Sequence, residues 1–149
     1  MPDFFQFKQF TIHQDRCGMK VGTDGVLLGA WAKGGKHILD IGTGTGLIAL
    51  MLAQRYPDAE ITGVELDEQA ALQAQENVAG SPFAQQVTIK NTPIQHFSHQ
   101  PNLHGRFSSI VSNPPFYHSL KSKSHERTLA RHTESLTFPE LFESVSLLL

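Results

Sequence analysis

Two patterns of apolar residues alternate along most of the chain. Short apolar runs typical of buried strands lie at 37–41, 60–65, 86–90 and 107–112. Apolar or amphipathic segments of helical length lie at 47–55, 67–79 and 139–149. Because strands that alternate with helices form parallel sheets, we predict a doubly wound α/β fold with the spatial strand order 3-2-1-4. A ligand should then bind beyond the carboxyl ends of these strands.

A hairpin and a helix are predicted ahead of this alternating region. Residues 4–13 show a partial apolar/polar alternation of strand type, and Met19–Val21 is expected to return as the second strand. A helix is predicted over 26–32, with Thr23 or Asp24 as its N-cap. The aromatic residues of this part are expected to pack into the core; they are Phe4, Phe5, Phe7, Phe10 and Trp31.

Length and composition are those of one ordinary globular domain. The chain has 149 residues, of which 40% are hydrophobic and 17% are charged. We expect a single structural domain in which residues 1–35 cover a site built by residues 36–149. No apolar stretch approaches the roughly 18 residues of a membrane helix, and the acidic N-terminus does not resemble a signal peptide. A cytoplasmic location without membrane contact is therefore expected.

A glycine-rich turn follows the first strand of the predicted sheet. Asp40 precedes Gly42, Gly44 and Gly46, which occupy alternate positions before a helix. Glycines there allow a tight turn and let a ligand approach the backbone amides at the helix start. Glu65 ends the next strand, where a carboxylate can accept hydrogen bonds from both hydroxyls of a ribose. This arrangement resembles the S-adenosyl-L-methionine (SAM) loop of class I methyltransferases; a dehydrogenase, whose glycine spacing differs, is the less favoured alternative.

An Asn-Pro-Pro-Phe motif at 113–116 directly follows the fourth strand. It is similar to the motif of methyltransferases that modify amino groups. That resemblance implies that the Asn113 side chain and the Pro114 carbonyl accept hydrogen bonds from the target amine, and that Phe116 stacks on a planar target. An exocyclic amine of a purine is a poor nucleophile, so two acceptors would aim its lone pair and stabilise the developing positive charge.

Two further segments narrow the resemblance to one family. Residues 19–31 and 127–132 are similar to the bacterial methyltransferases that modify the 6-amino group of an adenine beside the anticodon of a valine tRNA. The resemblance covers nearly the whole chain and implies SAM as cofactor and tRNA as partner. It also implies that Val21, Thr23 and Asp24 help to close over the cofactor. The candidate cofactor-binding residues are Val21, Thr23, Asp24, Asp40, Gly42, Gly44, Gly46, Glu65 and Leu66.

A basic segment follows the Asn-Pro-Pro-Phe motif. Residues 118–137 carry a net charge of +2, whereas the whole chain carries −2. Such a cluster can be a solvated loop, but beside an anticodon loop it could contact phosphates. Moving an unpaired base out of an RNA loop into an active site also requires less free energy than extracting a paired base. The candidate substrate-binding residues are Lys121, Lys123, Arg127, Arg131 and His132.

Several alternatives remain open at this point. The same motif could act on a protein glutamine or a DNA adenine, or the chain could bind SAM without transferring a methyl group. His96, His99 and His104 lie in a polar loop without cysteine or acidic partners, so no metal site is expected. After the third strand, residues 90–94 lack the acid that often binds the cofactor adenine, and Asn91 or a backbone group is the candidate substitute.

The chain also looks shorter than its family. The resemblance implies three more strands, so we expect a sheet that is incomplete at its C-terminal end. A fourth strand left at the edge would favour self-association, although the oligomeric state cannot be derived from the sequence.

Overall fold

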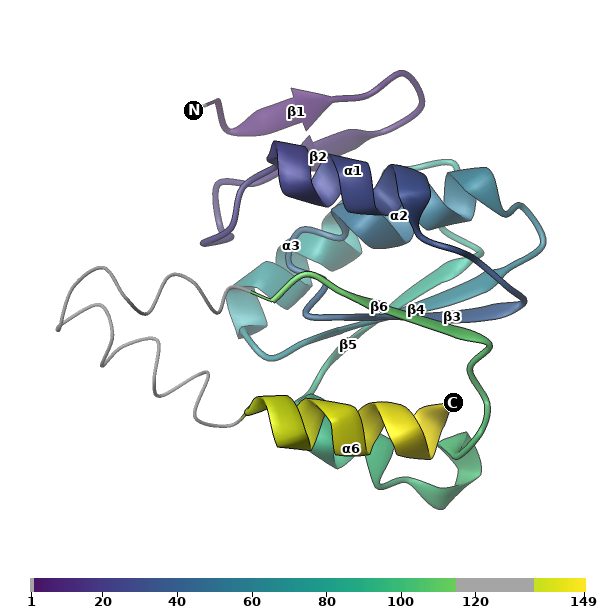
Figure 1. The fold of residues 1–149 in the computed structure, drawn as a ribbon. Helices are drawn as coiled ribbons and strands as arrows, with labels where there is room; N and C mark the ends of the chain where they lie inside the picture. The colour runs from purple at the N-terminus through teal and green to yellow at the C-terminus, as the bar shows by residue number, and fades with distance from the viewer. Residues whose placement is uncertain (1, 115–135) are drawn as a thin grey trace, which may run out of the picture.

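A parallel sheet of four strands forms the middle layer of the structure, a computed structural model that describes residues 2–114 and 136–149 (Figure 1). The strands are β3 (His37–Ile41), β4 (Glu60–Glu65), β5 (Val87–Asn91) and β6 (Ser109–Ser112). Their spatial order is β5-β4-β3-β6. The predicted order 3-2-1-4 is therefore confirmed, and so is the doubly wound α/β class.

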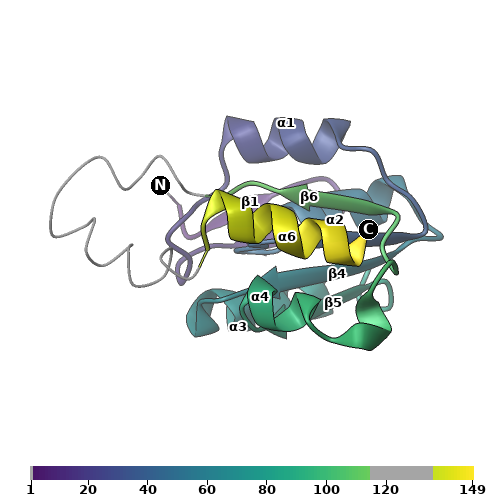
Figure 2. The ribbon, with the colours of Figure 1, turned by 60° about the horizontal axis from the view of Figure 1, so that its bottom comes forward.

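Helices cover both faces of the sheet (Figures 1 and 2). The helices on one side are α1 (Thr23–Trp31), α2 (Leu47–Arg55) and α3 (Glu68–Ala79). The elements on the other side are α4 (Ile94–Ser98), the 3₁₀ turn η1 (Pro101–Leu103) and α6 (Phe138–Leu148). Successive strand residues point to opposite faces, so Ile38 and Leu39 enter two different apolar clusters. No helix among the described residues is long and apolar enough to cross a membrane.

The connection between β5 and β6 contains structure that the sequence did not predict. Ile94 and Phe97 of α4 are buried in the same apolar cluster as Leu141 of α6. The helix is only five residues long, too short for its apolar spacing to stand out from a loop. Strand β6 begins two residues later than predicted, because the Phe107 amide donates to the Leu148 carbonyl of α6 at 3.0 Å.

The N-terminal hairpin lies entirely within the first predicted strand segment. Strands β1 (Phe4–Gln6) and β2 (Thr11–His13) pair antiparallel, so the prediction that Met19–Val21 is a strand was wrong. The Val21 amide instead donates to the Gln14 side chain at 2.8 Å. The residues after β2 therefore form a loop that side chains hold in place.

The start and the exposed face of α1 also differ from the prediction. Gly22, and not Thr23 or Asp24, is the N-cap, and no side chain caps the helix. Trp31 is 87% exposed, so its assignment to the core was wrong. The buried face of α1 consists of Gly25 and Gly29. A Cβ on Gly29 would lie 2.5 Å from the Met51 sulfur, so glycine allows α1 to approach α2 closely and leaves Trp31 on the outer side.

The four N-terminal phenylalanines divide between core and surface. Phe10 is buried and Phe7 packs partly buried against the same apolar cluster. Phe4 and Phe5, in β1, are 50% and 44% exposed, so for these two the core prediction was wrong. Phe4 and Phe5 point to opposite faces of the hairpin, and all three residues of β1 are exposed, so neither face of this strand is covered by the core.

Candidate active site

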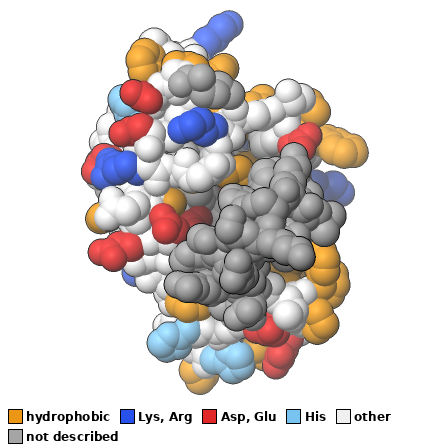
Figure 3. All heavy atoms as spheres, turned by 90° about the vertical axis from the view of Figure 1, so that its left-hand side faces the viewer, with side chains coloured by type: hydrophobic (Ala, Val, Ile, Leu, Met, Phe, Trp, Pro, Cys, Tyr) orange, Lys and Arg blue, Asp and Glu red, His pale blue; other side chains and the backbone are white. Residues whose placement is uncertain are grey.

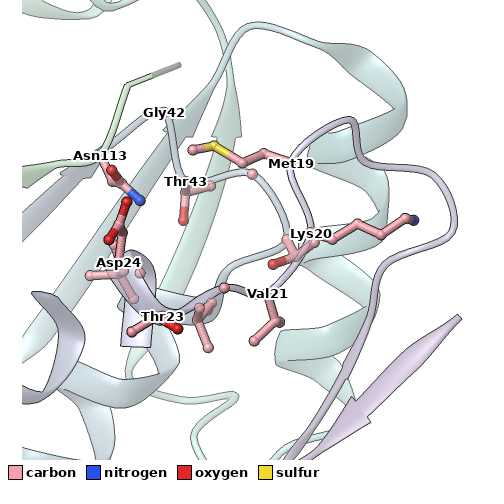
Figure 4. Close-up of a pocket in the computed structure, with 14 residues that line it drawn as sticks. Met19, Lys20, Val21, Thr23, Asp24, Gly42, Thr43 and Asn113 are labelled. Carbon is pink, nitrogen blue, oxygen red and sulfur yellow. The ribbon is translucent and has the colours of Figure 1, made fainter. Parts of the chain in front are cut away.

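A pocket of about 240 Å³ lies at the carboxyl end of the sheet (Figure 4). Its walls come from residues 19–25, from residues 42–45 with Leu47 and Ile48, and from Asn113. The second group follows β3 and Asn113 follows β6, the two neighbouring strands between which the strand order reverses. Ligands of open α/β sheets bind at this kind of switch point.

The glycine loop after β3 has a backbone that requires glycine. Gly42, Gly44 and Gly46 have φ angles of 71°, 57° and 89°, in the left-handed region that other residues rarely adopt. The amides of Gly42 and Thr43 donate to the Val64 carbonyl at 2.8 and 3.0 Å, which ties the loop to the end of β4. A Cβ on Gly42 would meet no atom within 4 Å, so this part of the backbone faces open space.

Glu65 is fixed beside the loop by two backbone amides. Its Oε1 accepts from Gly44 at 2.8 Å and its Oε2 accepts from Asp67 at 3.0 Å. Burial raises the pKa of Glu65, and the two amides oppose that rise. Each carboxylate oxygen retains a lone pair for a further hydrogen bond. Glu65 and the half-exposed Leu66 adjoin the pocket loop but are not part of the pocket wall.

Asp40 lies beneath the loop rather than in the pocket. It is 1% exposed, and the Thr43 hydroxyl donates to its Oδ2 at 2.8 Å. Its Oδ1 has no hydrogen-bond partner within the described parts of the chain. Burial raises the pKa of Asp40 to about 7, although the Thr43 hydrogen bond opposes the rise, and repulsion from Glu65 adds to it. Asp40 therefore supports the loop from below.

Gly63 makes room for this support, although sequence reasoning did not select it. It pairs with Asp40 across the sheet, and a Cβ there would lie 2.8 Å from the Thr43 hydroxyl. A glycine inside a strand often marks such a close approach, and that was the available signal.

Asn113 projects into the pocket from the end of β6. Figure 4 shows its carboxamide pointing toward the Asp24 side chain across the opening. Its Nδ2 would lie 3.7 Å from a Cβ on Gly25, so the glycine leaves space beside the amide. Pro114 follows directly and is partly exposed, whereas Phe116 lies outside the described residues.

The candidate residues of the N-terminal part share one wall of the pocket. Val21, Thr23 and Asp24 all line it, as do Met19 and Lys20, which sequence reasoning missed. The Lys20 ammonium donates to the Gln14 carbonyl at 2.7 Å, an interaction set by the fold of the loop and invisible in a linear pattern.

The predicted cationic cluster lies outside the described residues. This applies to the substrate candidates Lys121, Lys123, Arg127, Arg131 and His132. On the face shown in Figure 3, the coloured Lys and Arg side chains are scattered among Asp and Glu side chains. The described part of this face therefore presents no continuous cationic patch.

Two of the three histidines between β5 and β6 bond to nearby backbone through their rings. The rings of His99 and His104 contact the carbonyls of Gln95 and Ser98, the latter at 2.9 Å. Within residues 2–114 and 136–149, no group of three or more His, Cys, Asp or Glu side chains could hold a metal ion.

The architecture and the pocket define a Rossmann-like fold of the methyltransferase type. The geranyl diphosphate C-methyltransferase of Streptomyces coelicolor matches 85% of this chain and 40% of its own, with a TM-score of 0.61 and 16% identity. A putative SAM-dependent methyltransferase of Methanococcus maripaludis matches 83% of this chain and 48% of its own, with a TM-score of 0.59 and 15% identity. The model of the methyltransferase small domain family matches residues 20–137, and the chain belongs to this family.

Curated relatives with about 50% sequence identity to this chain are named as one specific kind of methyltransferase. The tRNA1(Val) (adenine(37)-N6)-methyltransferase of Bacteroides thetaiotaomicron is 54% identical over 98% of this chain and 62% of its own length. The protein of the same name in Erwinia tasmaniensis is 52% identical over 95% of this chain and 59% of its own. The chain thus spans about three fifths of the length of these curated relatives.

Proposed function

We propose that this chain binds SAM in the described pocket and serves the transfer of a methyl group to the 6-amino group of an adenine in the anticodon loop of a valine tRNA. The observation that carries the proposal is that Asn113 and the glycine loop line one pocket. A group that can hold an amine then lies beside a group that can hold the methyl donor. The names of the similar relatives support the choice of substrate, and an enzyme of this kind would work in the cytoplasm.

The residues present fit SAM as a ligand. The left-handed glycines leave open space above Gly42, where polar ligand atoms can approach the backbone. The Glu65 carboxylate is oriented by its two amides and has lone pairs left for ribose hydroxyls. When bound, SAM supplies a methyl group on a positively charged sulfur. Val21, Thr23 and Asp24 would close over it from the opposite wall.

The role of Asn113 is to orient the amine. Its side-chain oxygen and the Pro114 carbonyl would each accept one amine hydrogen, which directs the nitrogen lone pair into the pocket. The same acceptors would stabilise the positive charge that develops on nitrogen as the new bond forms. This arrangement requires no strong general base. Stacking by Phe116 and phosphate contacts by the basic segment rest on the resemblance alone.

The test is methyl incorporation from labelled SAM into total tRNA, DNA or a protein extract, each offered separately. The Bacteroides thetaiotaomicron relative serves as the positive control, and the Asn113→Ala variant as the negative control. Label in tRNA, located at an adenine, is the expected result. Label in DNA or protein would replace the proposed substrate, and calorimetric binding of SAM without any transfer would identify a binding module.

A further inference from the structure

Three buried amide side chains hold the loop that becomes the pocket wall. Gln14, Gln73 and Asn77 are 0%, 1% and 2% exposed. Side chains of this type are usually at the surface, and when buried they need hydrogen-bond partners. All three have partners in or beside residues 13–21, which we call the wall segment because residues 19–21 at its end line the pocket.

Gln14 and Gln73 do not contact the glycine loop: besides their bonds within the wall segment, Gln14 donates from its Nε2 to the Pro2 carbonyl at 2.8 Å. Gln14 accepts from the Val21 amide at 2.8 Å, which closes the segment on itself. Gln73, on α3, accepts from the Arg16 amide at 2.9 Å and donates to the Asp15 carboxylate at 2.7 Å. These contacts fix the shape of the wall segment and its position on α3.

Asn77 differs because it contacts both the start of the wall segment, at His13, and the glycine loop, at Thr45. Its Oδ1 accepts from the His13 amide and its Nδ2 donates to the His13 carbonyl, both at 3.0 Å. The same Nδ2 donates to the Thr45 carbonyl of the glycine loop at 2.8 Å. Within the described chain, no other side chain hydrogen-bonds to both the wall segment and the glycine loop. Packing adds to this junction, since the Cys17 sulfur lies 3.5 Å from where a Cβ of Gly44 would be.

We infer that Asn77 is a positioning residue for the SAM site, which holds the wall segment and the glycine loop at the separation that the ligand requires. The inference takes the ligand from the proposed function. Asn77 lines no part of the pocket, so it acts only through the two segments that it joins. If its bonds are lost, each segment keeps its own internal contacts, but the packing of Cys17 near Gly44 alone must then hold their relative position.

Asn77→Asp tests this inference, because the aspartate has the same shape but cannot donate to the two carbonyls. Gln73→Glu is the comparison: it is the same amide-to-carboxylate change, on the same helix and similarly buried, at a residue that contacts only the wall segment, where the new carboxylate also meets that of Asp15. Gln75→Glu, at an exposed position of α3, controls for the added charge. SAM affinity is measured by calorimetry, and hydrogen exchange of the unliganded protein follows residues 13–21 and 43–46.

We expect Asn77→Asp to weaken SAM binding by about tenfold or more and to speed exchange in both segments. Gln73→Glu should speed exchange in the wall segment only and weaken binding less, while Gln75→Glu should change neither. A purely structural role would lower the melting temperature of Asn77→Asp yet leave the affinity of the folded protein unchanged, and that result would overturn the inference.

The inference can still be tested if Asn77→Asp does not fold or if the unaltered chain does not bind SAM. If Asn77→Asp does not fold, the neutral Asn77→Ser variant is measured in the same way. If the unaltered chain does not bind SAM, the proposed function fails, but the exchange pattern still tests the junction. Faster exchange confined to the wall segment in Asn77→Asp would then refute the coupling.

Discussion

Replacing Asp40 by asparagine should remove a pH-dependent loss of unfolding free energy. Asp40 is buried beneath the glycine loop, with one oxygen bound by Thr43 and the other without a partner among the described residues. Asparagine has the same shape, and its carbonyl oxygen can still accept from the Thr43 hydroxyl. The substitution therefore keeps the packing and removes the ionisable group.

The magnitude follows from the pKa of the buried carboxyl. Burial raises the pKa of Asp40 from its ordinary value of 3.8 to about 7. Between these values the folded state binds a proton more tightly than the unfolded state. The free energy of unfolding therefore falls as pH rises from about 4 to about 7, and is constant above that. At about 1.4 kcal/mol per pKa unit, the full loss is about 4 kcal/mol, and Asp40→Asn should not show it.

The assay is urea unfolding of the unliganded protein between about pH 4.5 and about pH 8, followed by circular dichroism. The difference in unfolding free energy between Asp40→Asn and the unaltered chain should grow in favour of the variant as pH rises through this range. Taking the difference cancels the titration of groups common to both proteins. Asp58→Asn, at an exposed turn position, is measured alongside as the control for replacing an aspartate by asparagine. If the unfolding free energies of Asp40→Asn and the unaltered chain changed with pH in the same way, the argument that burial of the ionised Asp40 destabilises the folded state would be refuted.

Three predictions concern the proposed cofactor and substrate sites. Gly44→Asp should abolish SAM binding in calorimetry, because its φ is 57° and the new side chain would start 3.5 Å from the Cys17 sulfur, between the glycine loop and the wall segment; unchanged affinity would show that the loop does not bind the cofactor. Glu65→Ala should weaken SAM binding by roughly 1–3 kcal/mol through loss of charged hydrogen bonds, and no effect would place Glu65 outside the site. Asn113→Ala should leave SAM affinity within a few fold but lower the methyl-transfer rate by about 10²–10³; normal turnover would remove its assigned role.

The parts predicted well from sequence are those set by local signals. Strand order followed from alternating apolar runs, and the left-handed turns followed from glycines at positions 42, 44 and 46. The conformations of these segments depend mainly on residues close in the chain, so a linear pattern contains the information.

The parts predicted badly depend on contacts between distant segments. Met19–Val21 is a loop and not a strand because Gln14 binds the Val21 amide, and Asn77 binds His13 across 64 positions of sequence. Trp31 is exposed because the glycines of α1 face α2. The nine residues of this helix are apolar on more than one side, so the sequence alone did not show which face would be buried. Gly63 acquires its role through the Thr43 side chain of the glycine loop and the Ile89 side chain of β5, both of which a Cβ there would meet.

The distribution of the pocket wall along the chain affects when the site can form during synthesis. Its first wall comes from residues 19–25, but Asn113 closes it much later in the chain. A ribosome adds about 5–20 residues per second, so several seconds separate the emergence of the first wall from that of Asn113. A ligand stabilises only the state that it can bind. Until the fourth strand of the sheet has left the ribosome, a ligand of the complete pocket therefore cannot stabilise the nascent hairpin and glycine loop.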